Sequence, residues 1–250
     1  DISLIARQIM DAVPNPWVAY NLSERAINSF SIRYDDKMIS DNLAFIIEEL
    51  KKLINKEIDR LSEQVFRSLV AEKELRFFLL SNKGGYDLPT TVVIKSDSKR
   101  LTKYNNSPIE KSLFEFAEEE KFNEPEKAVA LYLDEQGKLL WWYRNIARQN
   151  YFIQGWKKHK IYPDFVFTET DDIKQDDYKM VHVIEIKGLH LKNEDTDYKK
   201  NVFDFCNELG ELGEQKDWEE LNMEFADKQV RFQVIFEDEW RKKINEIFAV

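Results

Sequence analysis

The chain has 250 residues and is 43% hydrophobic, which is enough for a substantial core in one large domain or two modest ones. Its single cysteine, Cys206, excludes an intrachain disulfide, and no apolar run approaches the roughly 18 residues that a membrane span requires. We therefore expect a cytoplasmic protein with no membrane partner. Because the sequence starts at Asp1 without a secretory signal, we also expect a piece of a longer polypeptide.

The first region is predicted to be mainly helical. Apolar residues recur at helical spacing from about Ser40 to Leu80, with Glu and Lys between them, which predicts a long amphipathic helix. The Thr- and Val-rich run from Pro89 to Ile94 predicts a strand. The polar stretch from Ser96 to Pro108 is the expected boundary. Residues 1–110 would then form a helical linker or coupling region, and residues 111–250 a second domain.

The second domain is predicted to alternate helices and strands, which is an α/β fold. A helix from about Glu124 to Glu135 has Asn123 as its N-cap and Pro125 in its first turn. Runs rich in β-branched and aromatic residues predict strands over Lys138–Tyr143, Tyr151–Trp156, Phe165–Thr168 and Lys179–Lys187. The remainder predicts a helix over Asp195–Met223, a strand over Gln229–Phe236 and a helix over Glu237–Phe248.

The net charge of -10 argues against a nucleic-acid partner, but this charge is unevenly distributed. No Asp or Glu occurs from Gly137 to Pro163. The basic residues of that stretch are Lys138, Arg144, Arg148, Lys157, Lys158 and Lys160. Such a stretch is either a surface that contacts nucleic-acid phosphates or an ordinary solvated face, and both interpretations stay open.

The candidate site combines Asp164 with Glu185 and Lys187. Alternate side chains of a strand share a face, so Glu185 and Lys187 are expected to lie side by side. Apart from Glu185 itself and His182, their strand is apolar from Met180 to Ile186, so it is expected to be central, where charged groups are costly unless paired or metal-bound. His182 alternates away from Glu185 and is expected to be a satisfied sheet histidine.

These residue types suit metal-assisted hydrolysis of a phosphodiester. The carboxylates of Asp164 and Glu185 are hard oxygen ligands for Mg²⁺, and the backbone carbonyl of Ile186 is a further candidate ligand. A bound Mg²⁺ polarises the phosphate and lowers the pKa of a bound water. Lys187 would orient that water or neutralise charge in the transition state.

Pro163-Asp164 followed by Glu185-x-Lys187 resembles the signature of the PD-(D/E)xK nucleases. The helix that contains Glu126 and the string from Trp141 to Asn145 are similar to the nuclease domains of type III restriction enzymes and related helicase-nucleases. The resemblance covers roughly Leu113 to Phe236. It implies a restriction-endonuclease-like αβββαβ core with a mixed central sheet. It also implies cleavage of double-stranded DNA with Mg²⁺, or with Mn²⁺ in its place.

The resemblance assigns further site residues. Glu126 would be a helix carboxylate directed at the metal, although Asn123-x-x-Glu126 is also a capping box that bonds the first helical turn. Tyr198 and Lys199 lie where family members place residues near the site, and a solvated helix start explains them as well. The expected DNA-contact residues are Arg144, Arg148, Lys157, Lys158, Tyr198 and Lys199.

Type III enzymes join the nuclease to an ATP-driven motor, and no Walker-type phosphate loop occurs in this sequence. The resemblance therefore implies a helicase or translocase region elsewhere in the same polypeptide, with ATP serving only that motor. A methyltransferase and recognition subunit is a further implied partner. Two alternatives stay open: a nuclease-like module that has lost activity and only binds DNA or docks a partner, and a repair nuclease that acts on branched or single-stranded DNA.

Overall fold

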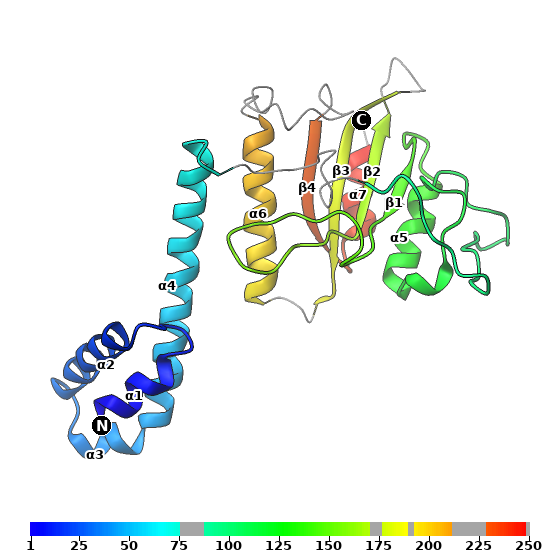
Figure 1. Cartoon of the computed structure of the whole chain (residues 1–250). Coiled ribbons are helices and arrows are strands. Elements are labelled where there is room, and N and C mark those ends of the chain that lie inside the picture. The colour runs from blue at the N-terminus through cyan, green and yellow to red at the C-terminus, as the bar shows by residue number, and fades with distance from the viewer. Residues whose placement is uncertain (76–87, 171–176, 190–192, 212–228, 249–250) are drawn as a thin grey trace. The chain divides into compact units, whose positions relative to one another are not determined.

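The computed structural model describes residues 1–75, 88–170, 177–189, 193–211 and 229–248 (Figure 1). The chain divides into two compact units, Asp1–Arg76 and Phe77–Val250. The predicted mixed α/β class and the helical N-terminal region are confirmed. None of the helices in the described ranges is long and apolar enough to cross a membrane.

The first unit is helical. Its elements are α1 (Ile2–Ile9), α2 (Pro16–Ser31), α3 (Asp36–Asp41) and α4 (Leu43–Ala71). Asn15 caps α2 by accepting hydrogen bonds from the N–H groups of Trp17 and Val18. Its small core buries Ala6 and Ile9 of α1 against Ala19 of α2 and packs them on α4.

The long helix predicted from Ser40 to Leu80 is present as α4 but ends earlier, at Ala71. The chain turns there because Lys73 adopts a left-handed conformation, with a φ of 61°. The N–H groups of Glu74 and Leu75 then donate to the carbonyl of Leu69, at 2.9 and 3.0 Å. These bonds satisfy a carbonyl at the helix end and stop the helix.

The second unit is built on a sheet. Its elements are a 3₁₀ turn (Glu119–Lys121), α5 (Glu124–Asp134), β1 (Trp142–Arg144), β2 (Phe165–Thr170), β3 (Tyr178–Lys187), α6 (Glu194–Glu211), β4 (Gln229–Phe236) and α7 (Trp240–Phe248). In the described residues the sheet has the order β1-β2-β3-β4. β2 pairs antiparallel with β1 and β3, whereas β4 pairs parallel with β3, so the sheet is mixed. As predicted from its apolar run, β3 is a central strand.

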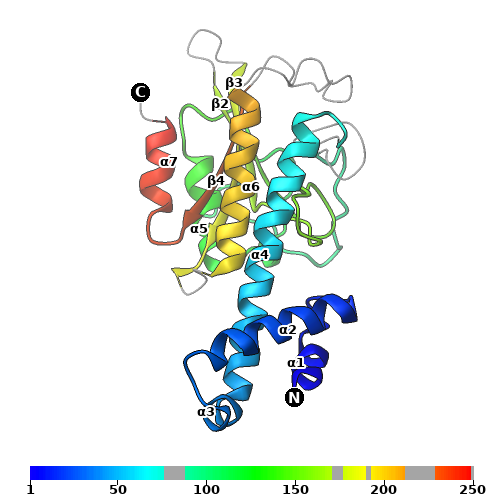
Figure 2. The same ribbon diagram turned by 90° about the vertical axis from the view of Figure 1, so that its left-hand side faces the viewer.

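Helices cover both faces of this sheet, with α6 on one face and α5 and α7 on the other (Figures 1 and 2). The core on the α5 and α7 side buries the alternating Phe165 and Phe167 of β2 with Ile184 of β3. On the α6 side, Phe203 packs on Phe232 of β4 with ring centroids 5.6 Å apart. Burial of each such side chain stabilises the fold by about 1.5–3 kcal/mol.

Three of the predicted strands are wrong or shortened, and the one expected over Lys138–Tyr143 is seen only as the short β1. The run Pro89–Ile94 is not a strand and pairs with no strand of the described residues, and Val93 is 89% exposed. The run Tyr151–Trp156 forms only a single bridge, between Ile153 and Ile161. Its first carbonyl, that of Tyr151, is taken by the side chain of Asn145 instead of a neighbouring strand.

The division between the units lies N-terminal to the boundary expected at Ser96–Pro108. The reason is that Leu101 and Ile109 are buried in the core of the second unit. The helix predicted over Asp195–Met223 is seen as α6, and residues 212–228 lie outside the described part of the chain. The last helix begins at Trp240, three residues later than predicted.

Candidate active site

The charged residues of the predicted site meet where β2, β3 and α6 come together. Asp164 immediately precedes β2, and Glu185 and Lys187 lie at the end of β3. Because Phe165 pairs with Ile184, the register brings Asp164 next to Glu185. Ile184 points into the core under α5 and α7, so its neighbour Glu185 points to the face that α6 covers.

Glu185 is held by two ammonium groups. Its Oε1 lies 2.8 Å from Nζ of Lys187 and 2.9 Å from Nζ of Lys199 in the second turn of α6. The contact with Lys187 confirms that both side chains share one face of β3. Glu185 is only 4% exposed, and its Oε2 is buried with no hydrogen-bond partner among the described residues. That oxygen is the acceptor that the site leaves unused.

Lys199 stays charged in this environment. Burial alone would lower the pKa of Lys199, but the carboxylates of Glu185 and Asp195 outweigh it and raise the pKa above its usual value. The sequence alone predicts that Lys199 contacts DNA. The structure instead brings its ammonium to Glu185.

A backbone contact orients the carboxylate of Asp164 toward β3. Its Oδ2 accepts a hydrogen bond from the N–H of Ile186 at 2.7 Å. Burial and the nearby Glu185 raise the pKa of Asp164, although Arg144 and the Ile186 N–H oppose this shift. Two mutually repelling carboxylates therefore lie beside each other, and an added cation would relieve their repulsion.

Glu126 reaches this group through Arg144. Nη2 of Arg144 lies 2.7 Å from Oε1 of Glu126 and 3.9 Å from Oδ1 of Asp164. Oε2 of Glu126 accepts from the N–H of Asn123, whose side chain accepts from the N–H of Glu126, so the capping box is formed. Both oxygens of Glu126 are thus engaged within the protein.

Asn145 is a site-shaping residue that the sequence did not single out. Its side chain is fully buried, and its Nδ2 donates to the carbonyls of Tyr151 and Pro163, at 2.7 and 2.8 Å. It thereby fixes the residue before Asp164. The available signal was its place at the end of the Trp141–Asn145 string, where an amide follows a strand.

The acid-free stretch contains a basic hairpin, residues 153–161. Ile153 and Ile161 exchange two backbone hydrogen bonds of 2.8 and 2.9 Å that close it. At one side the hairpin rests on Tyr198 of α6, whose hydroxyl accepts from the N–H of Lys157 at 3.2 Å. Gly155 allows this approach, because a Cβ there would lie 2.6 Å from the Tyr198 hydroxyl. The hairpin is therefore anchored one residue away from Lys199.

The predicted DNA-contact residues fall into two groups. Arg144 and Lys199 are engaged with the carboxylates of the site, and Tyr198 is buried under the basic hairpin. Arg148 and Lys158 are exposed, as is Lys160, which precedes the closing residue Ile161 of the hairpin. The ammonium of Lys157 lies 4.9 Å from the centre of the Tyr198 ring.

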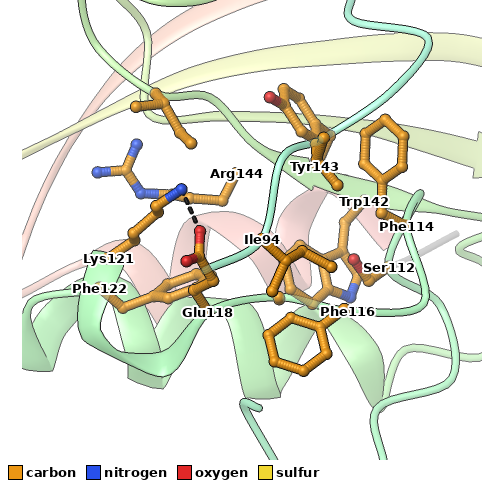
Figure 3. Close-up of a pocket in the computed structure, with 13 residues that line it drawn as sticks. Ile94, Ser112, Phe114, Phe116, Glu118, Lys121, Phe122, Trp142, Tyr143 and Arg144 are labelled. Atoms are coloured by element: carbon orange, nitrogen blue, oxygen red, sulfur yellow. Dashed lines mark ion pairs between the residues drawn. The ribbon is translucent and has the colours of Figure 1, made fainter. Parts of the chain in front are cut away.

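A small apolar pocket of about 50 Å³ lies beside Arg144. Figure 3 shows the ion pair of Lys121 with Glu118 on the same side as Arg144, and the rings of Phe114 and Phe116 on the other side. Its volume has room for a few water molecules. Arg144 lines this pocket, whereas Asp164 and Glu185 are not among its lining residues.

The metal donors of the site are few. The part of the chain that the structure describes contains no group of three or more His, Cys, Asp or Glu side chains arranged to hold a metal ion. His182 is buried in the sheet, where its Nε2 lies 3.2 Å from Oε2 of Glu169. Asp164 and Glu185 remain as two adjacent carboxylates, and Oε2 of Glu185 is the free buried oxygen.

Comparisons with protein-family models, with curated proteins and with solved structures found no match to this chain. Its function has to be inferred from its own residues and their geometry.

Proposed function

We propose that the second unit is a Mg²⁺-dependent nuclease domain of the PD-(D/E)xK kind that hydrolyses phosphodiester bonds of double-stranded DNA. The observation that carries this proposal is the meeting of Asp164, Glu185 and Lys187 at the end of two central strands, with the ammonium of Lys187 2.8 Å from Glu185. The order α5-β1-β2-β3-α6-β4 and the mixed sheet support it.

The donor set fits Mg²⁺. This ion commonly takes only one or two protein carboxylates and completes its octahedron with water and substrate oxygens. Asp164 and Glu185 would hold it, with Oε2 of Glu185 as the unused acceptor and the Ile186 carbonyl as a further candidate. The bound ion would polarise the scissile phosphate and generate the attacking hydroxide.

The chain's own residues would position and neutralise charge. The N–H of Ile186 orients the carboxylate of Asp164, and Lys187 places an ammonium beside Glu185, where negative charge grows on the phosphate oxygens. Arg144 links Asp164 to Glu126 and so fixes the helix α5 against the site. Glu126 acts in this scheme through Arg144.

The basic hairpin supplies the approach for DNA. Lys158 and Lys160 are exposed on it, and neither forms an ion pair with an acidic residue of the described ranges, although the ammonium of Lys160 lies 3.7 Å from the centre of the Phe152 ring. Contacts from such side chains to phosphates position a duplex without reading its sequence. The hairpin leads through Tyr162 and Pro163 directly to Asp164.

The proposed setting is a helicase-coupled restriction enzyme. In it a motor region of the same polypeptide hydrolyses ATP, the helical first unit couples the motor to the nuclease, and a methyltransferase and recognition subunit selects the site.

One observation favours a second candidate, a module that binds DNA without cleaving it. Each carboxylate of the cluster, those of Glu126, Asp164, Glu185 and Asp195, already lies within 4 Å of Arg144, Lys187 or Lys199, so every one has a cation without a metal. A purely structural ion-pair network would have this balance. Cleavage assays separate the two functions.

The decisive experiment is plasmid cleavage by the protein in Mg²⁺ with and without EDTA. We expect cleavage that EDTA abolishes, that Asp164→Asn and Lys187→Ala reduce at least about 100-fold, and that the matched charge change Asp204→Asn on the exposed side of α6 leaves intact. Wild-type cleavage by Lys187→Ala would refute the active-site assignment. DNA binding without any cleavage would favour the second candidate. Comparison of duplex, branched and single-stranded substrates then tests the choice of duplex.

A further inference from the structure

The carboxylate of Glu185 is shared by cations from two different elements. Lys187 comes from the same strand, and Lys199 comes from α6. Both ammonium groups contact the same oxygen, Oε1, and leave Oε2 buried without a partner among the described residues. Glu185 thus has two counter-ions at Oε1 and an unused hydrogen-bond acceptor at Oε2.

A divalent ion that binds Glu185 meets these two positive charges at close range. The ion would relieve the repulsion between Asp164 and Glu185, but it would itself be repelled by the two ammonium groups beside Glu185, because like charges in a partly buried site repel strongly. Metal binding is therefore favoured if one protein cation moves away from Glu185.

Lys199 is the cation with an alternative partner. Its Nζ lies 3.5 Å from Oδ2 of Asp195, which is one helical turn earlier on α6 and whose side chain is 63% exposed. Among the described residues Lys187 forms an ion pair with Glu185 alone, and its backbone is fixed in the sheet by pairing with Phe236 of β4. A small rotation of the Lys199 side chain would keep its contact with Asp195 and give up its contact with Glu185.

We propose that Lys199 is a positioning residue that serves as the counter-ion of Glu185 in the metal-free protein and is displaced toward Asp195 when the divalent ion binds. The inference rests on the proposed metal site. In this scheme Lys199 of α6 weakens the affinity for the metal ion while no substrate is bound. A phosphodiester adds negative charge beside the ion and the displaced ammonium, so metal and DNA bind cooperatively.

The test measures binding of Mn²⁺ alone, without DNA, from the electron paramagnetic resonance signal of the free ion. Groups that surround metal ligands change affinity by about 10–100-fold. We expect Lys199→Met to lower the Kd for Mn²⁺ by about 10-fold, because the competing charge is removed. Lys199→Arg keeps a cation and should bind Mn²⁺ with nearly the wild-type Kd. Asp195→Asn removes the alternative partner and should raise the Kd.

The matched control is Lys200→Met, which removes the same charge from the next, exposed residue of α6 and should leave the Kd unchanged. An unchanged or higher Kd for Lys199→Met, with wild-type circular dichroism, overturns the inference. An unchanged Kd for Glu185→Gln instead shows that the ion binds elsewhere, and this outcome refutes the proposed metal site together with the role of Lys199. If Lys199→Met fails to fold, a raised Kd for Asp195→Asn supports the inference and an unchanged one overturns it.

Discussion

Asp134, the last residue of α5, is predicted to be a main determinant of stability in the second unit. Its carboxylate accepts hydrogen bonds from the N–H groups of Lys111 (2.8 Å) and Glu110 (3.1 Å) and from Nε1 of Trp142 (3.1 Å). Nζ of Lys103 lies 3.2 Å away. Because the carboxylate is fully buried, Asp134→Ala would leave the three N–H donors without their acceptor, and the ammonium of Lys103 would keep only Glu110, 3.3 Å away. Removal of one partner of such a buried pair costs about 3–5 kcal/mol.

The assay is urea unfolding followed by circular dichroism at pH 7. We expect Asp134→Ala to lower the free energy of unfolding by about 3–5 kcal/mol and Asp134→Asn, which keeps one oxygen acceptor, by about 2 kcal/mol. Glu135→Gln, an exposed charge change one residue later, should stay within about 0.5 kcal/mol of wild type. A loss below about 1 kcal/mol for Asp134→Ala would refute the reasoning.

The same variants test the pH dependence. Burial raises the pKa of Asp134, but the N–H groups of Lys111, Trp142 and Glu110 and the ammonium of Lys103 outweigh it, so the pKa is lower than in the unfolded chain. The stabilisation is therefore complete above the unfolded pKa of about 3.9 and is lost as the pH falls through the folded pKa. The difference between wild type and Asp134→Asn should be smaller at about pH 3 than at pH 7.

Three further predictions follow from buried or closely packed groups. Burial lowers the pKa of His182, so its contribution to stability is complete above about pH 6.5 and falls below it; His182→Gln should flatten the urea midpoint between pH 7 and pH 5, and an equal effect of the exposed His159→Gln would contradict this. A Cβ at Gly155 would lie 2.7 Å from Cγ2 of Val202, so Gly155→Ala should cost about 1–3 kcal/mol in thermal unfolding; Val202→Ala should restore part of the Tm, and a Tm that does not change would speak against the contact. Asn145→Ala should reduce DNA cleavage by about 10–100-fold with unchanged DNA binding in a filter assay, whereas unchanged cleavage would show that Asp164 needs no such support.

Local signals predicted the elements that depend on neighbouring residues. The start of α5 follows from Asn123 and Pro125, which cap it and open its first turn. The long apolar run of β3 predicted a central strand. The failed strand at Tyr151–Trp156 had the right composition, but its backbone is bound by Asn145 and its glycine packs on α6. These are tertiary contacts that a pattern along the chain does not contain.

The candidate site, too, was predictable from the sequence only in part. The alternation of strand side chains predicted that Glu185 and Lys187 are neighbours, and Nζ of Lys187 contacts Glu185. The approach of Asp164 needed the register of β2 against β3, which Phe165 and Ile184 set. The destination of Lys199 depends on how α6 packs on the sheet, and its sequence position at a helix start is compatible with DNA contact or with the observed ion pair.

The sheet order has a consequence for motion. β2 and β3 are hydrogen-bonded on both sides, so their amide protons are exposed to solvent mainly when the whole second unit opens, and Glu185 lies on this slowly exchanging backbone. The basic hairpin is closed by only two backbone bonds, so the amides of Lys158 and Lys160 should exchange far sooner. In the proposed nuclease, the carboxylates would therefore lie on a rigid backbone next to a flexible basic hairpin. The hairpin would adjust to differences in the shape of the bound DNA, while the spacing of the carboxylates stays constant.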